Sequence, residues 1–263
     1  MIANAAGPGA VSSFDDFTPA AYLAEYYHSV YSENDHLLRF FAQAAGLVGE
    51  GASIQEYGGG PTVYQLISLA PRAASIHFTD YLRSNLDEVE RWLVSHEQAH
   101  DWRPFIRSAL LHEGHQTAGP DEIRHREALM RERVRSCGHV DALNPGAGEA
   151  PGRTFDVVST SFVAESIAGS HAQWKTALAS ICAGVAPTGL LIMTAIRNAP
   201  YWVSGGRRYP SFPIDRDRLV EGLAELGFSP LLVEELDADV KDSADPGYKG
   251  YDGTLLTVSR RQF

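Results

Sequence analysis

The chain has 263 residues, long enough for one large α/β domain or at most two small ones, and its composition, 44% hydrophobic and 21% charged, is typical of an ordinary globular protein. Its 33 acidic residues outnumber 22 basic ones, and the formal net charge of −11 disfavours nucleic acid and anionic membranes as partners. Only two cysteines occur, with no CxxC spacing, and no apolar run has the length of a signal peptide or membrane helix. We therefore expect a cytoplasmic monomer or weak homo-oligomer that holds no metal.

The N-terminal region predicts a tail followed by two helices. Residues 1–13 are rich in Ala, Gly and Ser and are expected to be disordered. Residues 18–31 carry apolar and aromatic side chains at helical spacing behind Pro19, which suits the first helical position. A second helix is expected from Ser32, where Ser32 and Asp35 have the spacing of a capping box. We expect these helices, within residues 14–50, to adjoin a core at 51–263, both in one domain spanning 14–263.

From residue 51 onward the predicted strands and helices alternate. Five strands are expected at 53–57, 75–79, 139–143, 155–161 and 190–196. The helices between and after them are expected from 62 to 69 and at 84–94, 102–112, 120–135, 170–183 and 215–226. A surface hairpin is expected within 201–212, and a last pair of strands at 231–236 and 254–258. The pattern predicts a doubly wound, mostly parallel seven-stranded sheet with an antiparallel edge.

A glycine-rich turn follows the first expected strand, in Glu56-Tyr57-Gly58-Gly59-Gly60-Pro61-Thr62. Ligands of doubly wound sheets bind at the carboxyl ends of the strands, and glycines there let backbone amides approach a ligand closely. Asp80 closes the second strand, where an acidic side chain accepts hydrogen bonds from ribose hydroxyls. Together these features predict a nucleoside site.

The type of nucleoside follows from what the turn lacks. A dinucleotide fingerprint requires a glycine at the position of Val63, and Pro61 removes a backbone donor that a pyrophosphate would need. These two residues favour a phosphate-free ligand such as S-adenosylmethionine. An NAD-dependent oxidoreductase remains an alternative, as does a protein that binds S-adenosylmethionine without transferring its methyl group.

Four segments carry a resemblance to a known family. They are Phe17-Thr18-Pro19 with Tyr22-Leu23-Ala24-Glu25-Tyr26-Tyr27, the glycine turn continued through Val63-Tyr64-Gln65, Thr79-Asp80-Tyr81, and Asp101-Trp102-Arg103-Pro104-Phe105. In these segments the chain resembles the small-molecule N-methyltransferases that include nicotinamide, phenylethanolamine and thioether methyltransferases. The resemblance implies a class I, Rossmann-like methyltransferase fold, S-adenosylmethionine as cofactor, and residues 14–50 as a helical lid.

The same resemblance implies a set of cofactor-binding residues. Tyr22 is also expected beside the reacting atoms, and Asp141 is the alternative to His139, which stands where the family has an aspartate. The expected cofactor-binding residues are Tyr22, Tyr27, Gly58, Gly59, Gly60, Thr62, Tyr64, Asp80, Tyr81, Asn85, His139, Val140 and Thr160.

The acceptor side departs from the family pattern, because Thr194 occupies a position that is acidic in some members. Glu165, or else Asp252, is the acid expected to orient an amine or take its proton. Asn198, Tyr201 and Trp202 are the candidate acceptor wall. The expected reaction is methyl transfer to a small molecule, foremost to an amine or heteroaromatic nitrogen, with transfer to oxygen, sulfur or carbon as alternatives.

Overall fold

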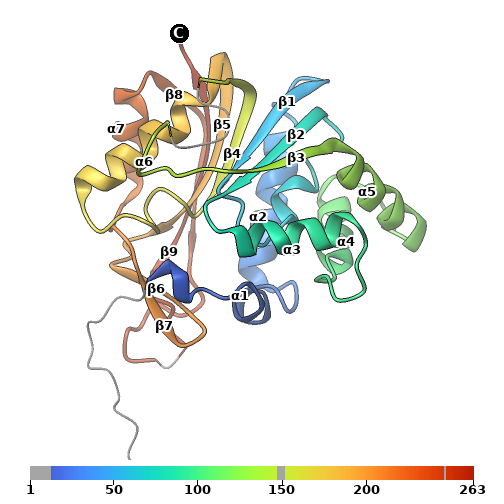
Figure 1. Cartoon of the computed structure of the whole chain (residues 1–263), viewed down its shortest axis with the longest axis horizontal. Coiled ribbons are helices and arrows are strands. Elements are labelled where there is room, and N and C mark those ends of the chain that lie inside the picture. The colour runs from blue at the N-terminus through green and yellow to red at the C-terminus, as the bar shows by residue number, and fades with distance from the viewer. Residues whose placement is uncertain (1–12, 147–151, 246) are drawn as a thin grey trace, which may run out of the picture.

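The computed structural model describes residues 13–146, 152–245 and 247–263. The expected tail at 1–13 therefore lies, apart from Ser13, outside the described residues. A seven-stranded sheet runs through the middle of the molecule, with helices on both of its faces (Figure 1). The predicted doubly wound class is thereby confirmed.

The sheet has the strand order β3-β2-β1-β4-β5-β9-β8. The strands β3, β2, β1, β4 and β5 run parallel to one another, whereas β9 is antiparallel to β5 and to β8. The strands are β1 (Ala52–Tyr57), β2 (Ala73–Asp80), β3 (Val134–His139), β4 (Phe155–Ser161), β5 (Val185–Arg197), β8 (Phe228–Asp237) and β9 (Gly253–Arg261). A separate hairpin joins β6 (Tyr201–Ser204) to β7 (Arg207–Pro210), as the sequence predicts.

The helices bury two hydrophobic clusters, one against each face of the sheet. Neighbouring residues of β5 alternate between them, with Ile192 in one cluster and Leu191 and Met193 in the other. This period of two is what a strand covered on both faces requires. The helices are η1 (Phe14–Asp16), α1 (Pro19–Tyr26), α2 (Ser32–Ala45), η2 (Tyr64–Leu66), α3 (Arg83–Leu93), α4 (Arg103–His112), α5 (Pro120–Arg133), α6 (His171–Ala183) and α7 (Arg216–Glu225).

The third strand lies earlier than predicted, and the loop that follows it was mistaken for the strand. β3 spans Val134–His139, so α5 stops at Arg133, and residues 140–143 form a loop. β3 is the edge strand of the sheet and is largely solvent-accessible, so it needs no apolar run. The apolar residues at 140–143 instead face the cavity described below.

Two predicted N-terminal features and one predicted helix also differ. α1 ends at Tyr26, because the chain turns at Tyr27 and buries that ring in the core. The Ser32 hydroxyl caps no helix and donates to Asp239. After the glycine turn only the short 3-10 helix η2 forms, and its three residues are all buried.

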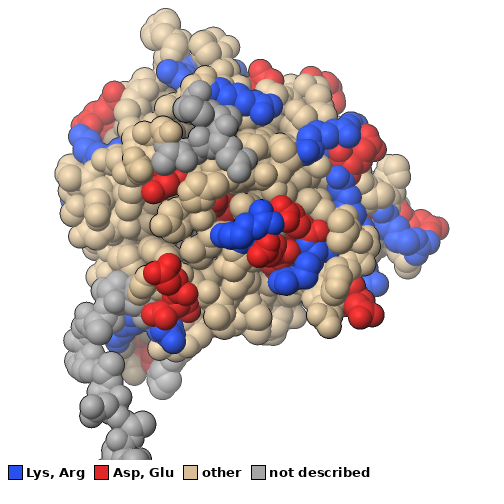
Figure 2. Space-filling view, viewed as in Figure 1, with Lys and Arg blue, Asp and Glu red and all other residues tan. Residues whose placement is uncertain are grey.

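Charged residues of opposite sign lie beside one another on the molecular face in Figure 2, for example over α3, where Arg83 and Asp87 pair at 2.8 Å. Among the described residues no helix is both long and apolar enough to span a bilayer. In the same residues no group of three or more His, Cys, Asp or Glu side chains is arranged to hold a metal ion.

Candidate active site

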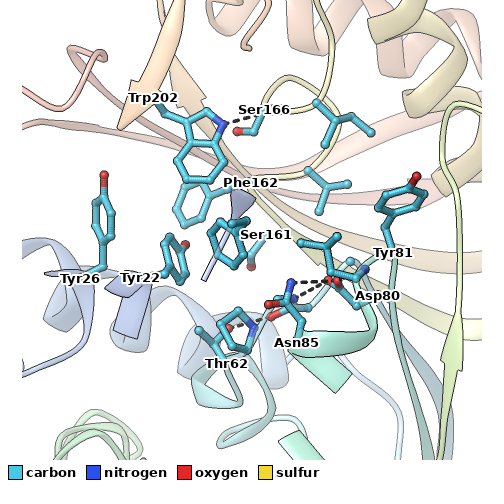
Figure 3. Close-up of a pocket in the computed structure, with 18 of the residues that line it drawn as sticks. Tyr22, Tyr26, Thr62, Asp80, Tyr81, Asn85, Ser161, Phe162, Ser166 and Trp202 are labelled. Carbon is cyan, nitrogen blue, oxygen red and sulfur yellow. Dashed lines mark hydrogen bonds between the residues drawn. The ribbon is translucent and has the colours of Figure 1, made fainter. Parts of the chain in front are cut away.

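A cavity of about 410 Å³ lies at the carboxyl ends of the parallel strands. Tyr57, Asp80 and Ser161, the last residues of β1, β2 and β4, line it, together with Ile196 near the end of β5. Figure 3 shows Asp80, Asn85 and Tyr81 on one side of this cavity, and Tyr22, Tyr26 and Trp202 on the other. The fold therefore places this cavity where a doubly wound sheet binds its ligands.

The glycine turn forms the floor of the cavity beside Asp80. Gly58 has φ +67, and a Cβ there would lie 2.6 Å from the Val163 side chain, so only glycine fits without a shift. Two side chains hold the turn from behind, because the Thr62 hydroxyl and the Gln65 amide both donate to the Gly59 carbonyl, at 2.8 and 3.0 Å. The backbone is thus fixed close to the ligand space.

Asp80 is organised before any ligand binds. Its Oδ2 accepts the Gly60 amide at 2.8 Å, while its Oδ1 accepts the Leu82 amide at 2.8 Å and the Asn85 side-chain amide at 2.9 Å. Burial raises the pKa of Asp80, and these three hydrogen bonds oppose the rise. The carboxylate is therefore rigid and has lone pairs left for ligand hydroxyls.

Asn85 supplies an independent sign that this side of the cavity binds a ligand. Its Nδ2 is bonded to Asp80, whereas its Oδ1 is buried without a hydrogen-bond partner among the described residues. Asn85 lines the cavity, and buried polar atoms are nearly always paired, so the ligand is expected to donate to this oxygen. The residues on this side fit the ribose and neighbouring polar groups of a nucleoside.

The other side of the cavity is aromatic. The Tyr22 ring lies 5.1 Å from that of Tyr26, 5.6 Å from that of Tyr27 and 6.2 Å from that of Trp202. The Trp202 indole is oriented by its Nε1, which donates to the Ser166 carbonyl at 3.0 Å. Phe162, Tyr31 and Tyr251 complete this wall. Such faces attract flat rings and cations.

The N-terminal segment is held over the cavity by the β6–β7 hairpin. The Tyr26 hydroxyl donates to the Val203 carbonyl at 2.6 Å, and the Gly205 amide donates to Glu25 at 3.0 Å. Arg207 of the hairpin pairs with Asp16 at 2.8 Å. Residues far apart in sequence therefore close the site together, at the bottom of the view in Figure 1.

Most of the residues predicted to bind the cofactor line this one cavity. They are Tyr22, Tyr27, Gly58, Gly59, Gly60, Thr62, Tyr64, Asp80, Tyr81, Asn85 and Val140, and Trp202 of the predicted acceptor wall joins them. Their individual roles stay predictions.

Two predicted cofactor residues do not line the cavity. The Thr160 side chain is buried and donates to the Tyr57 carbonyl at 2.9 Å, so the next residue, Ser161, reaches the cavity instead. The His139 ring packs at a tilt against Tyr81, with ring centroids 5.5 Å apart, and does not line the cavity. Asp141 lines the cavity in its place, which matches the alternative drawn from the sequence.

Glu165, the acid predicted for the acceptor, is 0% exposed and does not line the cavity. Its Oε1 accepts the Ile196 amide at 2.9 Å, and burial raises its pKa to about 7. It sits between the loop after β4 and the end of β5. In this structure Glu165 therefore ties that loop to β5.

The remaining acceptor-side candidates also lie off the cavity wall. Asp252 accepts a hydrogen bond from Arg197 at 2.7 Å and another from the Asn198 amide at 2.9 Å. Tyr201 lies under Arg208, whose guanidinium is 4.3 Å from the ring centroid. Asp252, Asn198 and Tyr201 are thus engaged in interactions outside the cavity lining.

Sequence reasoning missed Glu33 and Tyr251, which both line the cavity. Tyr251 donates to Glu33 at 3.1 Å, although the two residues are 218 positions apart in the chain. No local sequence pattern can predict a contact between residues so far apart in the chain. A sequence signal did exist for Ser161, since it ends a parallel strand just as Asp80 does.

Comparisons with known protein sequences identify relatives of this chain. Residues 9–262 match the model of the NNMT/PNMT/TEMT family. The chain is 28% identical to human nicotinamide N-methyltransferase over 81% of its own length and 82% of the relative's. It is 29% identical to human phenylethanolamine N-methyltransferase, with 86% and 83% covered. Mouse indolethylamine N-methyltransferase is 26% identical, with 94% and 93% covered.

Solved structures support the fold independently. The DhpI–SAH complex aligns with a TM-score of 0.55 at 14% identity and covers 92% of each chain. TehB from Haemophilus influenzae aligns with a TM-score of 0.52 at 10% identity, over 92% of this chain and 67% of the other. At such low identity the likeness concerns the arrangement of strands and helices.

Proposed function

The chain belongs to the NNMT/PNMT/TEMT family and is an S-adenosylmethionine-dependent methyltransferase, and we propose that it methylates a nitrogen atom of a small aromatic acceptor. The observation that carries the acceptor class is the aromatic side of the cavity, formed by Tyr22, Trp202 and Phe162 next to the glycine turn. A flat ring with a nitrogen, either an amine substituent or a ring atom, suits such a wall.

The residues that would hold the cofactor are those beside Asp80. Asp80 and Asn85 would bind the ribose, Asp141 would meet the adenine side, and Tyr22 and Tyr27 would cover the ligand. When bound, S-adenosylmethionine supplies an electrophilic methyl carbon on a cationic sulfur. The faces of Tyr22 and its aromatic neighbours suit a cation at this point of the cavity.

The protein's contribution to the reaction is positioning and the exclusion of water. Trp202 and Phe162 would hold the acceptor ring so that its nitrogen points toward the methyl carbon, in line with the bond that breaks. The segment from Phe14 to Tyr26, tied to the hairpin, would keep water from competing for the methyl group. No side chain has to protonate the leaving sulfur.

A screen with methyl-labelled S-adenosylmethionine tests the proposal. The panel contains aromatic amines and nitrogen heterocycles, each with its phenol and thiol counterpart of the same shape. We expect labelled product from nitrogen-containing members. Transfer confined to phenols or thiols would support methylation of oxygen or sulfur instead, and consumption of the cofactor without labelled product would support a non-methylating use.

Four further properties belong to the proposal. The enzyme acts in the cytoplasm, as a monomer or weak homo-oligomer, and within one domain in which residues 14–50 serve as a lid. It has neither nucleic-acid nor membrane partners, and the net charge of −11 supports this. Size-exclusion chromatography with light scattering, with and without the demethylated cofactor S-adenosylhomocysteine, measures the oligomeric state.

A further inference from the structure

Glu33 is an acid in the aromatic half of the cavity. It lies in the first turn of α2 and is half-buried, and its carboxylate accepts hydrogen bonds from the Tyr251 hydroxyl at 3.2 and 3.1 Å. Among the described residues it takes part in no ion pair. A carboxylate partly withdrawn from water without a counter-ion costs free energy, so a positively charged ligand group would be stabilised at this point of the cavity.

The groups around Glu33 do not neutralise its negative charge. The negative charge of Glu33 helps to raise the pKa of four tyrosines around it. They are Tyr22 and Tyr26 of α1, Tyr31 between the helices, and Tyr251 before β9. Asp239, the other charged neighbour, is acidic and raises the pKa of Glu33 further. The basic side chain nearby, Lys249, lies over the Tyr26 ring but is paired with Glu25. The pocket therefore combines an unpaired acid with aromatic faces.

We propose that Glu33, held by Tyr251, binds the amino group of an amine acceptor and selects it over a neutral molecule of the same shape. This inference rests on the proposed methyltransferase function and specifies its substrate. Aromatic cages that contain an acid recognise ammonium groups through cation–π attraction and an ion pair. The tyrosines and Glu33 supply both interactions.

The same carboxylate can prepare the nitrogen for reaction. An acceptor that arrives as an ammonium ion gives one N–H proton to Glu33, which leaves a neutral amine with a free electron pair. That pair forms the bond to the methyl carbon while the carbon–sulfur bond breaks and its electrons remain on sulfur. The product leaves as a methylated ammonium ion, and Glu33 returns its proton to water. Burial raises the pKa of Glu33 to about 7, closer to that of an amine than an ordinary glutamate, which favours this transfer.

The alternative is that Glu33 only accepts the Tyr251 hydrogen bond and so anchors α2 to the chain before β9. The variant Glu33→Gln separates the two roles, because glutamine keeps the shape and can still accept from Tyr251 but carries no charge. Asp35→Asn is the matched control. Asp35 is an acid on the same helix whose carboxylate bonds Ser108 and His112, outside the cavity.

The experiment measures binding to enzyme saturated with S-adenosylhomocysteine, so no turnover is needed. The probes are 2-phenylethylamine and its neutral analogue 2-phenylethanol, compared by calorimetry at pH 8. We expect the wild type and Asp35→Asn to prefer the amine at least tenfold, and Glu33→Gln to lose this preference while its affinity for S-adenosylhomocysteine changes less than twofold. The preference should also fade in the wild type as the pH falls below about 7, because Glu33 becomes neutral.

Two results would overturn the assignment. One is a wild-type enzyme that binds both probes equally, and the other is a Glu33→Gln variant that keeps the preference for the amine. The proposed function is tested separately by the labelled-methyl screen. Methyl transfer to nitrogen heterocycles together with an unchanged Glu33→Gln variant would reject the role of Glu33 and leave the methyltransferase activity standing.

Discussion

Asp80→Asn is the substitution that tests the nucleoside site most sharply. The Asp80 Oδ2 accepts the Gly60 amide at 2.8 Å, and Oδ1 accepts both the Leu82 amide and Asn85. Asparagine has one oxygen for these three donors, so whichever way its amide turns, an N–H group faces another N–H group. The glycine turn and the start of α3 would then lose a shared anchor.

The magnitude follows from the hydrogen bonds that are lost. A hydrogen bond to a charged acceptor contributes about 1.5–3 kcal/mol, and a buried donor left unpaired costs about 1–3 kcal/mol. Part of this loss also affects the free enzyme, so we expect the affinity for S-adenosylhomocysteine to fall by about 2 kcal/mol, or roughly 30-fold. The unliganded variant should also unfold at a lower urea concentration.

Isothermal titration calorimetry with S-adenosylhomocysteine gives the affinity directly. Asp87→Asn is the control, because Asp87 is an exposed acid of α3 that pairs with Arg83 outside the cavity. Its affinity should match that of the wild type. An Asp80→Asn variant that binds within twofold of the wild type would show that Asp80 does not hold the ribose.

Three other predictions concern the lid, the aromatic wall and the buried acid. S-Adenosylhomocysteine should slow limited proteolysis within residues 17–31, since the ligand completes contacts of that segment; equal cleavage rates would mean that it is fixed structure. Trp202→Ala should raise the KM for the acceptor about tenfold and leave cofactor affinity within twofold, and a changed cofactor affinity with an unchanged KM would reverse its assignment. Burial raises the pKa of Glu165 to about 7, so the stability given by its neutral form is lost as pH rises through that value. Glu165→Gln keeps an acceptor for the Ile196 amide, and its melting temperature relative to the wild type should rise from pH 5 to pH 8, whereas a constant difference would mean that the buried group does not titrate in this range.

The sheet was predictable because its signals are local. β5 contains the apolar run at residues 190–196, and the loop-and-acid pair at Gly58 and Asp80 follows from the carboxyl ends of β1 and β2. The third strand was predicted too far along the chain, because β3 is an exposed edge strand and has no apolar run to mark it. After the glycine turn only the three-residue 3-10 helix η2 forms, where the apolar spacing predicted a longer helix.

The acceptor half of the site was harder to predict because it is assembled from distant segments. Glu33, Trp202 and Tyr251 meet across most of the chain length, so no spacing in the sequence marks them as neighbours. Thr160 shows that the prediction can also be wrong by one residue. Neighbouring side chains of a strand point in opposite directions, so a shift of one residue decides whether a side chain faces the cavity. That shift gives the cavity position to Ser161.

A crystal structure of the complex with S-adenosylhomocysteine tests the central claim most directly. The account predicts that the ribose hydroxyls lie within hydrogen-bonding distance of Asp80, that a ligand group donates to Asn85 Oδ1, and that the sulfur faces Tyr22 and Trp202. A ligand bound in the reverse orientation, with its sulfur beside Asp80 and its adenine among the aromatic rings, would contradict the assignment of the two sides of the cavity.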